Sequence, residues 1–294
     1  MTLCVVNDGS DRDLVEKIVR AGIPARIDLD FVHNAEAVGQ VAALNSGFAR
    51  VKREFLAVHD DDDSWAPDFL VKMTRLLRQP ENARFIGAAC RAEIVEEDVE
   101  SDRIIFKESR VHHRYGPILS LFKLLHFYSH PPPIAVLMRR AVLDIVPANN
   151  PLMPVMYDCE WMVRVLMQAD VVALDETLCF YHQRRNDRPE LGPARNSVFE
   201  FGEEFNKLLL LVQNELLRDE LRRGTLGPGF ISSLNHFLHE LSFPLNAETS
   251  HYLSRRARRY FRRRERIRKV EARLRRMAAA LGLRKNPARH GRGG

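Results

Sequence analysis

Four consecutive aspartates, Asp60–Asp63, are the residues whose type and spacing predict chemistry most directly. They follow the apolar run Phe55–Val58, which is typical of a short buried strand. Carboxylates this close repel one another, by about 1 kcal/mol per pair even in bulk water. Their oxygens suit Mg²⁺ or Mn²⁺, and Mg²⁺ usually binds one or two protein carboxylates together with the phosphates of a substrate. A divalent cation is therefore the expected partner, and a solvated turn between a strand and a helix is the alternative.

The segments around these aspartates alternate between strands and helices. The patterns predict strands over residues 2–8, 25–34 and 54–60, and helices over residues 11–22, 35–51 and 66–79. This alternation predicts an α/β protein with a mostly parallel sheet flanked by helices. Ligands of such sheets bind beyond the carboxyl ends of the strands, where the aspartates and the turn Asn7–Ser10 both fall.

The second half of the chain is less regular. Residues 84–97 and 102–110 are predicted to form two antiparallel strands, residues 157–170 an amphipathic helix, and residues 171–183 one or two closing strands. From about Asn196 the pattern is that of helices alone. We therefore predict an α/β domain over residues 1–195 and a helical region with a basic tail over residues 196–294.

The charge is divided between an acidic body and a basic tail. The net charge is +6, but residues 251–294 hold 17 Lys and Arg against 2 Glu, which leaves −9 for residues 1–250. Leu253, Tyr260 and Ile267 recur at a step of seven, which indicates an apolar stripe on a basic helix. Such a helix suits the surface of an anionic membrane, and packing on the acidic body is the alternative. Nucleic-acid binding through the same arginines is disfavoured, because no fold motif supports it.

The composition favours the cytoplasm. No run of about 18 apolar residues is present, and the first residues do not resemble a signal peptide. The four cysteines form no C-x-x-C pair, so neither structural zinc nor a disulfide framework is expected. We predict a cytoplasmic protein, with the basic tail as a means of peripheral contact with the inner face of the cytoplasmic membrane.

Four motifs follow one another in a specific order: VVNDGSD, GQVAALNSGF, FLAVHDDDDSWAPDFL and YDCEWMVRVL. Together they resemble glycosyltransferase family 2, inverting enzymes of the GT-A (Rossmann-like) fold, over about residues 2–185. The resemblance implies metal-dependent transfer of a sugar from a nucleoside-diphosphate sugar, first of all a UDP-sugar, to a saccharide or lipid-linked acceptor in cell-surface polysaccharide or glycolipid synthesis. Family members normally begin with a further strand and helix, which this sequence lacks. A non-catalytic scaffold or a fragment is therefore the alternative.

The resemblance assigns the donor-binding residues at the first two motifs. Asp8 corresponds to the carboxylate that contacts the base or ribose of the nucleotide, and a capped Asp-Gly turn is the alternative. Gly39 and Asn45 correspond to the helix that lies against the nucleotide. For these two residues, packing and capping explain the sequence equally well.

The third motif carries the family's D-x-D. Counted back from Trp65, it falls on residues 60–62, so Asp60 corresponds to a contact with the ribose or sugar and Asp62 to the ligand of Mn²⁺ or Mg²⁺. Asp61 occupies the variable position, and Asp63 the acidic position that often follows. Trp65 and Pro67 are expected to pack.

The fourth motif implies a general base. Counted back from Arg164, Asp158 corresponds to the residue that takes the proton of the acceptor hydroxyl. Tyr157 departs from the family pattern, where Glu is common, and Glu160 is the second candidate for the base. An aspartate at a solvated helix start would give the same sequence.

The closing segment YHQRRND resembles the part of the family where basic residues approach the diphosphate. His182, Arg184 and Arg185 are the candidates there. His130, in the loop SHPPPI, is a candidate for the acceptor side, although a loop histidine without a catalytic role is the favoured interpretation.

Overall fold

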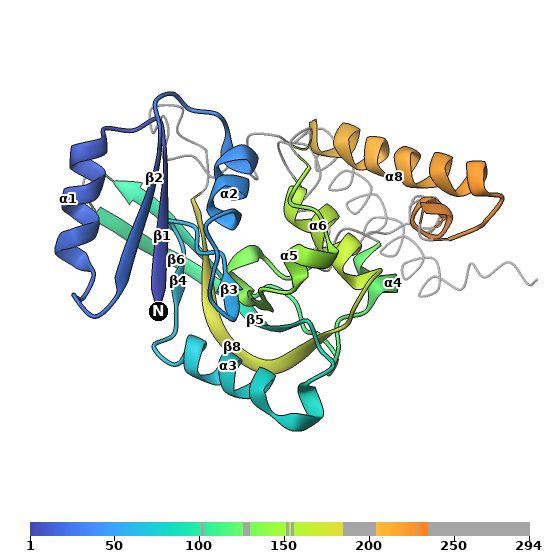
Figure 1. The fold of residues 1–294 in the computed structure, drawn as a ribbon, viewed down its shortest axis with the longest axis horizontal. Helices are drawn as coiled ribbons and strands as arrows, with labels where there is room; N and C mark the ends of the chain where they lie inside the picture. The colour runs from blue at the N-terminus through green and yellow to red at the C-terminus, as the bar shows by residue number, and fades with distance from the viewer. Residues whose placement is uncertain are drawn as a thin grey trace, which may run out of the picture. The chain divides into compact units, whose positions relative to one another are not determined.

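The computed structural model describes residues 1–100, 103–125, 130–150, 153, 156–184, 204–227 and 229–234, and Figure 1 shows their arrangement. The elements are β1 (Thr2–Asp8), α1 (Arg12–Gly22), β2 (Asp28–Asn34), α2 (Gln40–Phe48), β3 (Phe55–Ala57), β4 (Ser64–Trp65), α3 (Phe69–Arg78), η1 (Pro80–Asn82), β5 (Gly87–Glu100), β6 (Arg103–Val111), α4 (Leu121–Leu124), η2 (Pro133–Ala135), β7 (Val136–Arg139), α5 (Val142–Ile145), α6 (Tyr157–Leu166), β8 (Val171–Arg184) and α8 (Glu204–Arg223).

The predicted α/β class is confirmed, and strands and helices alternate from β1 to α3 as the patterns indicate. The strand that precedes the aspartates is shorter than predicted, because it ends at Ala57 and residues 58–63 form the loop to β4. α1 begins after Asp11, whose side chain accepts a hydrogen bond of 2.7 Å from the Leu14 amide and so caps the helix.

The predicted single, mostly parallel sheet is wrong in its pairing. β1 and β2 form a parallel two-stranded sheet of their own. The main sheet has the order β3-β7-β5-β8-β4, with β6 paired to β5. Within it β5 and β8 are parallel, whereas the β3–β7, β5–β7, β4–β8 and β5–β6 pairs are antiparallel. Hydrophobic periodicity identifies a strand, but it does not show which strand lies beside it.

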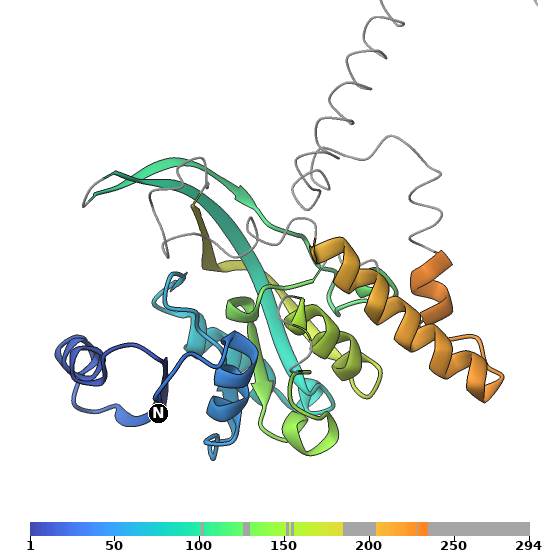
Figure 2. The same ribbon diagram turned by 90° about the horizontal axis from the view of Figure 1, so that it is seen from above.

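Helices cover both faces of the main sheet. On one face α3 inserts Phe69, Met73 and Leu77, each at most 1% exposed, against β5, β7 and β8. On the other face α2, α6 and α8 share a core that includes Phe48 and Trp161. Figure 1 shows α3 and α6 on opposite sides of the strands β5 and β8, and Figure 2 shows the strong curvature of β5.

The segment from β1 to β2 contributes little to these cores. α1 has no buried residue, and Leu14 and Ile18 on it are 56% and 62% exposed. Within the described part of the chain, β1 pairs with β2 alone and β3 pairs with β7 alone. Each of these two strands therefore has one edge without a strand partner among the described residues.

The predicted division at residue 195 stays a prediction. α8 is helical where the periodicity indicates a helix, but the tail from residue 235 onward lies outside the described residues. None of the described helices is long and apolar enough to cross a membrane.

Candidate active site

The four aspartates form the turn between β3 and β4, at the end of the main sheet. The Asp63 amide donates to the Asp60 carbonyl at 3.3 Å, which closes the turn. Asp61 is exposed, Asp60 and Asp62 are half-buried, and Asp63 is buried. The turn therefore directs its carboxylates into different environments, although the residues are chemically identical.

Negative charge accumulates at this turn. Burial, followed by the charges of Asp62, Asp158 and Asp61, raises the pKa of Asp60 to about 6. Burial also raises the pKa of Asp62, against the opposing effect of Arg184, whose Nη2 lies 3.7 Å from Asp62 Oδ2. Carboxylates that destabilise one another in this way provide the charge and the oxygen ligands that suit Mg²⁺ or Mn²⁺.

The end of β8 closes the site beside the aspartates. The His182 amide donates to Asp63 Oδ1 at 2.9 Å, and the His182 Nε2 atom lies 2.9 Å from Ser64 Oγ. Glu97 on β5 lies beside Arg184 in the parallel β5–β8 register. Its carboxylate lies 3.0 Å from His182 Nδ1 and accepts a hydrogen bond of 3.2 Å from Arg184 Nε.

Glu97 is a site residue that sequence reasoning missed. Its side chain is only 5% exposed. A glutamate is rarely buried unless it has a partner, and here His182 and Arg184 are the partners. The signal in the sequence was the pair Glu96-Glu97 inside a predicted strand, but the pattern did not show which residues would face it. Of the predicted basic residues, His182 and Arg184 reach the site, and Arg185 lies outside the described residues.

Asp158 lies at the start of α6 and faces the aspartate turn. His130 Nε2 lies 3.5 Å from Asp158 Oδ2. Burial raises the pKa of Asp158, but His130 and the backbone N–H groups of Cys159 and of Asp158 itself outweigh it and hold the pKa below its usual range. The group is therefore ionised near neutral pH, as a general base requires.

The second candidate for the base, Glu160, is committed to an ion pair. Its oxygens accept hydrogen bonds from Arg164 Nε at 2.7 Å and Arg164 Nη2 at 3.0 Å. Arg164 also donates to the Pro147 carbonyl at 2.6 Å, which ties α6 to the preceding loop. This geometry favours Asp158 over Glu160.

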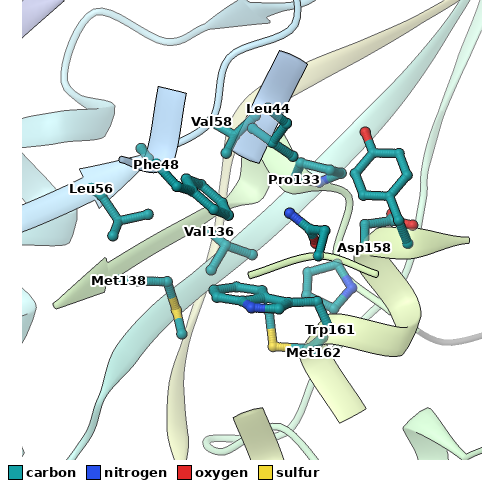
Figure 3. A pocket seen from close by; sticks show the side chains of 14 residues that line it. Leu44, Phe48, Leu56, Val58, Pro133, Val136, Met138, Asp158, Trp161 and Met162 are labelled. Atoms are coloured by element: carbon teal, nitrogen blue, oxygen red, sulfur yellow. The ribbon is translucent and has the colours of Figure 1, made fainter. Parts of the chain in front are cut away.

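An apolar pocket, part of it open to solvent, adjoins Asp158. Figure 3 shows Asp158 at one end and Leu56 and Met138 at the other, with Phe48 and Trp161 between them. The last four of these side chains are at most 8% exposed, so most of the pocket lies within the core. Asp158 is the acidic side chain in its lining.

Asp8 of the first motif joins the end of β1 to the segment before α2. Asp8 Oδ1 accepts hydrogen bonds from Asn34 Nδ2 and the Val38 amide, and Asp8 Oδ2 accepts one from the Gly39 amide, each at 2.9 Å. The backbone bond from Val38 is the main cause that lowers the pKa of Asp8. Gly39 adopts φ 92° at the start of α2, a conformation that favours glycine.

Asn45 joins α2 to the loop before α6. Its Nδ2 atom donates to the Asn149 carbonyl at 2.8 Å, and its Oδ1 atom accepts from the Asn149 amide at 3.0 Å. Asn149 is 3% exposed. The contacts of Asn45 among the described residues are those of a structural brace, and its predicted place against a nucleotide stays a prediction.

Trp65 packs, as predicted. Its ring stacks on Phe69 with a centroid separation of 4.4 Å, and its Nε1 atom donates to the Ile134 carbonyl at 2.8 Å. These contacts fix β4, and with it the end of the aspartate turn, to the loop that follows His130.

Comparisons with known proteins identify the class of fold. The mannosyltransferase PcManGT from Pyrobaculum calidifontis, solved with GDP-Man and Mn²⁺, is similar over 96% of this chain and 71% of its own, with 16% identity and a TM-score of 0.50. TarS 1-349 of S. aureus with UDP-GlcNAc is similar over 85% of this chain and 68% of its own, with 17% identity and a TM-score of 0.48. The fold is that of the GT-A glycosyltransferases.

The family follows from the sequence itself. Residues 1–145 match the model described as Glycosyl transferase family 2, so this part of the chain belongs to that family and the resemblance is confirmed there. The motif that carries Asp158 lies beyond the matched residues. The chain spans 55% of TarS 1-349 as solved without UDP-GlcNAc, with 12% identity and a TM-score of 0.45. No curated protein matches the chain significantly.

Proposed function

We propose that this protein is a metal-dependent inverting glycosyltransferase that moves a sugar from a nucleoside-diphosphate sugar to a saccharide or lipid-linked acceptor. The observation that carries the proposal is the convergence of Asp60 and Asp158, which lie 98 positions apart in the sequence. Val58, two residues before Asp60, lines the same pocket as Asp158, and the charge of Asp158 is one of the causes that raise the pKa of Asp60. The aspartate turn supplies a place for a charged donor, and Asp158 supplies a base beside it.

Asp62 is the residue that would hold the divalent cation, and Asp60 would contact the ribose or sugar beside it. Burial is the main cause that raises the pKa of both groups, so a cation bound there would stabilise their charged forms, and hard oxygen ligands suit Mg²⁺ or Mn²⁺. When bound, the ion would neutralise the charge that builds on the leaving diphosphate. The protein's own cation there, Arg184, lies between Asp62 and Glu97 and can approach the diphosphate as a second positive group.

Asp158 takes the proton from the acceptor hydroxyl as that oxygen attacks the anomeric carbon. A base facing the aspartate turn favours attack from the side opposite the leaving group, which inverts the configuration of the sugar. The neighbours solved with UDP-GlcNAc and with GDP-Man support a nucleotide-sugar donor, and a UDP-sugar is our first choice. We place the acceptor at a membrane on the strength of the basic tail, which makes peripheral contact with an anionic surface.

A non-catalytic scaffold is the second candidate function. It is favoured by Asp8, whose two carboxylate oxygens are both bonded to Asn34 and to the backbone of Val38 and Gly39 rather than directed at a ligand. A scaffold of this kind would keep the fold and bind neither nucleotide nor metal.

Calorimetric titration of UDP with and without Mn²⁺ distinguishes the two functions. We expect UDP to bind more tightly with Mn²⁺, and this gain to disappear in Asp62→Ala. Asp61→Ala is the matched control, because Asp61 belongs to the same turn but is exposed. GDP is titrated in the same way, since the donor nucleotide is not fixed by the site. Absence of binding by both nucleotides, in protein that is folded by circular dichroism, would support the scaffold instead.

A further inference from the structure

We propose that His130 is a positioning residue that holds the carboxylate of Asp158 in the orientation in which it accepts the proton of the acceptor hydroxyl. The inference rests on the proposed function, in which Asp158 is the base. His130 Nε2 lies 3.5 Å from Asp158 Oδ2, and the two side chains are 12% and 22% exposed. The contact is made through Oδ2 of the carboxylate, and the backbone N–H groups of Cys159 and Asp158 also bond to this group.

His130 and the residues that follow it are held in place. The Tyr115 hydroxyl donates to the His130 carbonyl at 3.2 Å. Prolines 131–133 follow and restrict the backbone, and the completely buried Ile134 accepts a hydrogen bond from Trp65 Nε1 at 2.8 Å. The imidazole therefore meets Asp158 from a backbone position that is already set, which is the condition for orienting a reacting group.

The other ring nitrogen of His130 makes no hydrogen bond among the described residues that would explain why a histidine stands at this position. His130 Nδ1 is buried and has no hydrogen-bond partner among the described residues. A buried polar atom without a partner is destabilising, and an apolar side chain of similar size would avoid this cost. The contact of Nε2 with Asp158 is therefore what the histidine contributes at this position.

Several titratable groups surround the pair. They are Asp60, Tyr157 and Cys159 on the side of Asp158, and His112, His113 and Arg110 on the side of His130. Burial, followed by the charges of His130 and Arg110, lowers the pKa of His113 to about 4, so His113 is neutral near pH 7. His130 is the imidazole whose Nε2 atom lies beside the Asp158 carboxylate.

The proton transfer is balanced within this arrangement. The acceptor O–H bond breaks as its proton passes to Asp158, and the acceptor oxygen forms a bond to the anomeric carbon. The bond from that carbon to the diphosphate oxygen breaks, and its electron pair leaves with the diphosphate. Asp158 ends the step protonated and later releases the proton to water. His130 acts on Asp158 throughout and does not contact the sugar.

Two substitutions separate orientation from simple filling of space. His130→Ala removes the contact, and His130→Gln keeps an N–H donor near the position of Nε2. The assay is the release of nucleotide from UDP-GlcNAc and from GDP-mannose with Mn²⁺, with water as the acceptor. We expect His130→Ala to lower kcat by about 10- to 100-fold with the donor KM unchanged, and His130→Gln to restore most of the loss.

The pH profile gives a signature that a merely structural role would not produce. Without His130, the backbone N–H groups of Cys159 and Asp158 remain to oppose burial, so the pKa of Asp158 should rise and the acid limb of the pH–rate profile should move to higher pH. His33→Ala is the matched control, because His33 forms a comparable pair with Glu16, at 3.2 Å, away from the aspartate turn. The control should change neither kcat nor the acid limb.

Histidine ¹⁵N NMR of the full chain tests the contact independently of turnover. The His130 signal, identified by its loss in His130→Gln, should shift in Asp158→Asn and stay unchanged in Glu16→Gln. An unshifted signal, or a His130→Ala enzyme with the kcat and pH profile of the wild type, would overturn the inference. If UDP binds with Mn²⁺ but Asp158→Asn retains full turnover, the base assignment fails and the inference fails with it. If no nucleotide binds, it is the proposed function that fails.

Discussion

Asp63 is the aspartate whose replacement tests the electrostatics of the site most directly. The residue is 9% exposed, and burial is the main cause that raises its pKa from 3.8 to about 8, against the favourable N–H of His182. Because the unfolded carboxyl titrates near its ordinary value, the folded protein binds the extra proton between about pH 4 and pH 8. The contribution of Asp63 to stability is therefore most favourable below about pH 4 and is lost progressively as the pH rises to about 8.

The magnitude follows from the width of this window. Between the ordinary pKa of 3.8 and pH 7 there are about three pH units over which Asp63 loses its contribution to the free energy of unfolding. At 1.36 kcal/mol per unit, the loss at pH 7 is at most about 4 kcal/mol. Asp63→Asn keeps an oxygen for the His182 amide at 2.9 Å and removes the ionisable group. The new amide N–H atoms cost about 1–3 kcal/mol if they find no partner. We expect the substitution to raise the free energy of unfolding at pH 7 by about 1–3 kcal/mol, the difference of these terms.

Urea unfolding between about pH 5 and pH 8 measures this effect, since carboxyl groups with shifted pKa values give a pH-dependent stability. The advantage of Asp63→Asn over the wild type should grow steadily with pH. Asp61→Asn, at an exposed position in the same turn, should show a nearly constant difference. An advantage of Asp63→Asn that is equal at every pH, or a slope as steep for Asp61→Asn, would refute the electrostatic reasoning.

Two further predictions concern the braces of the site. Asn45→Ala removes both hydrogen bonds to the buried Asn149, so urea unfolding should show that the free energy of unfolding falls by about 2–4 kcal/mol. The affinity for UDP with Mn²⁺ should stay unchanged. A variant of full stability that has lost this affinity would instead favour a contact between Asn45 and the nucleotide. Glu97→Gln removes the charge that holds Arg184, which can then pair with Asp62 more closely. Calorimetry should show Mn²⁺-dependent UDP binding weakened by about tenfold, which corresponds to 1.4 kcal/mol, and wild-type affinity would contradict this role of Glu97.

The sequence predicted the local elements and the acidic turn well, because both depend on short-range patterns. β1, α1 and α3 lie where the apolar periodicity places them, and Asp60–Asp63 follow a strand as predicted. The partners of these residues could not be predicted in the same way. Glu97 meets Arg184 only because β5 and β8 are parallel neighbours, a pairing that no short-range pattern encodes.

His130 illustrates the same limit. A histidine in a proline-rich loop is more often a surface residue than part of a site, and the sequence offered no reason to connect it with a helix 28 positions later. The connection arises from tertiary packing: Tyr115 and Trp65 fix the loop, and α6 presents Asp158 to it. Long-range contacts of this kind can be predicted only when the pairing of the strands is known.

The separate sheet of β1 and β2 also affects how the protein behaves in concentrated solution. A strand edge without a partner presents a row of backbone donors and acceptors that pairs readily with another chain. Leu14 and Ile18 on α1 add exposed apolar surface on the same segment. The solubility of the purified protein is thus expected to depend on this segment rather than on the aspartate turn, whose charge keeps molecules apart. Charged residues at positions 14 and 18 are the simplest way to obtain a better-behaved sample, because they leave the main sheet and its site untouched.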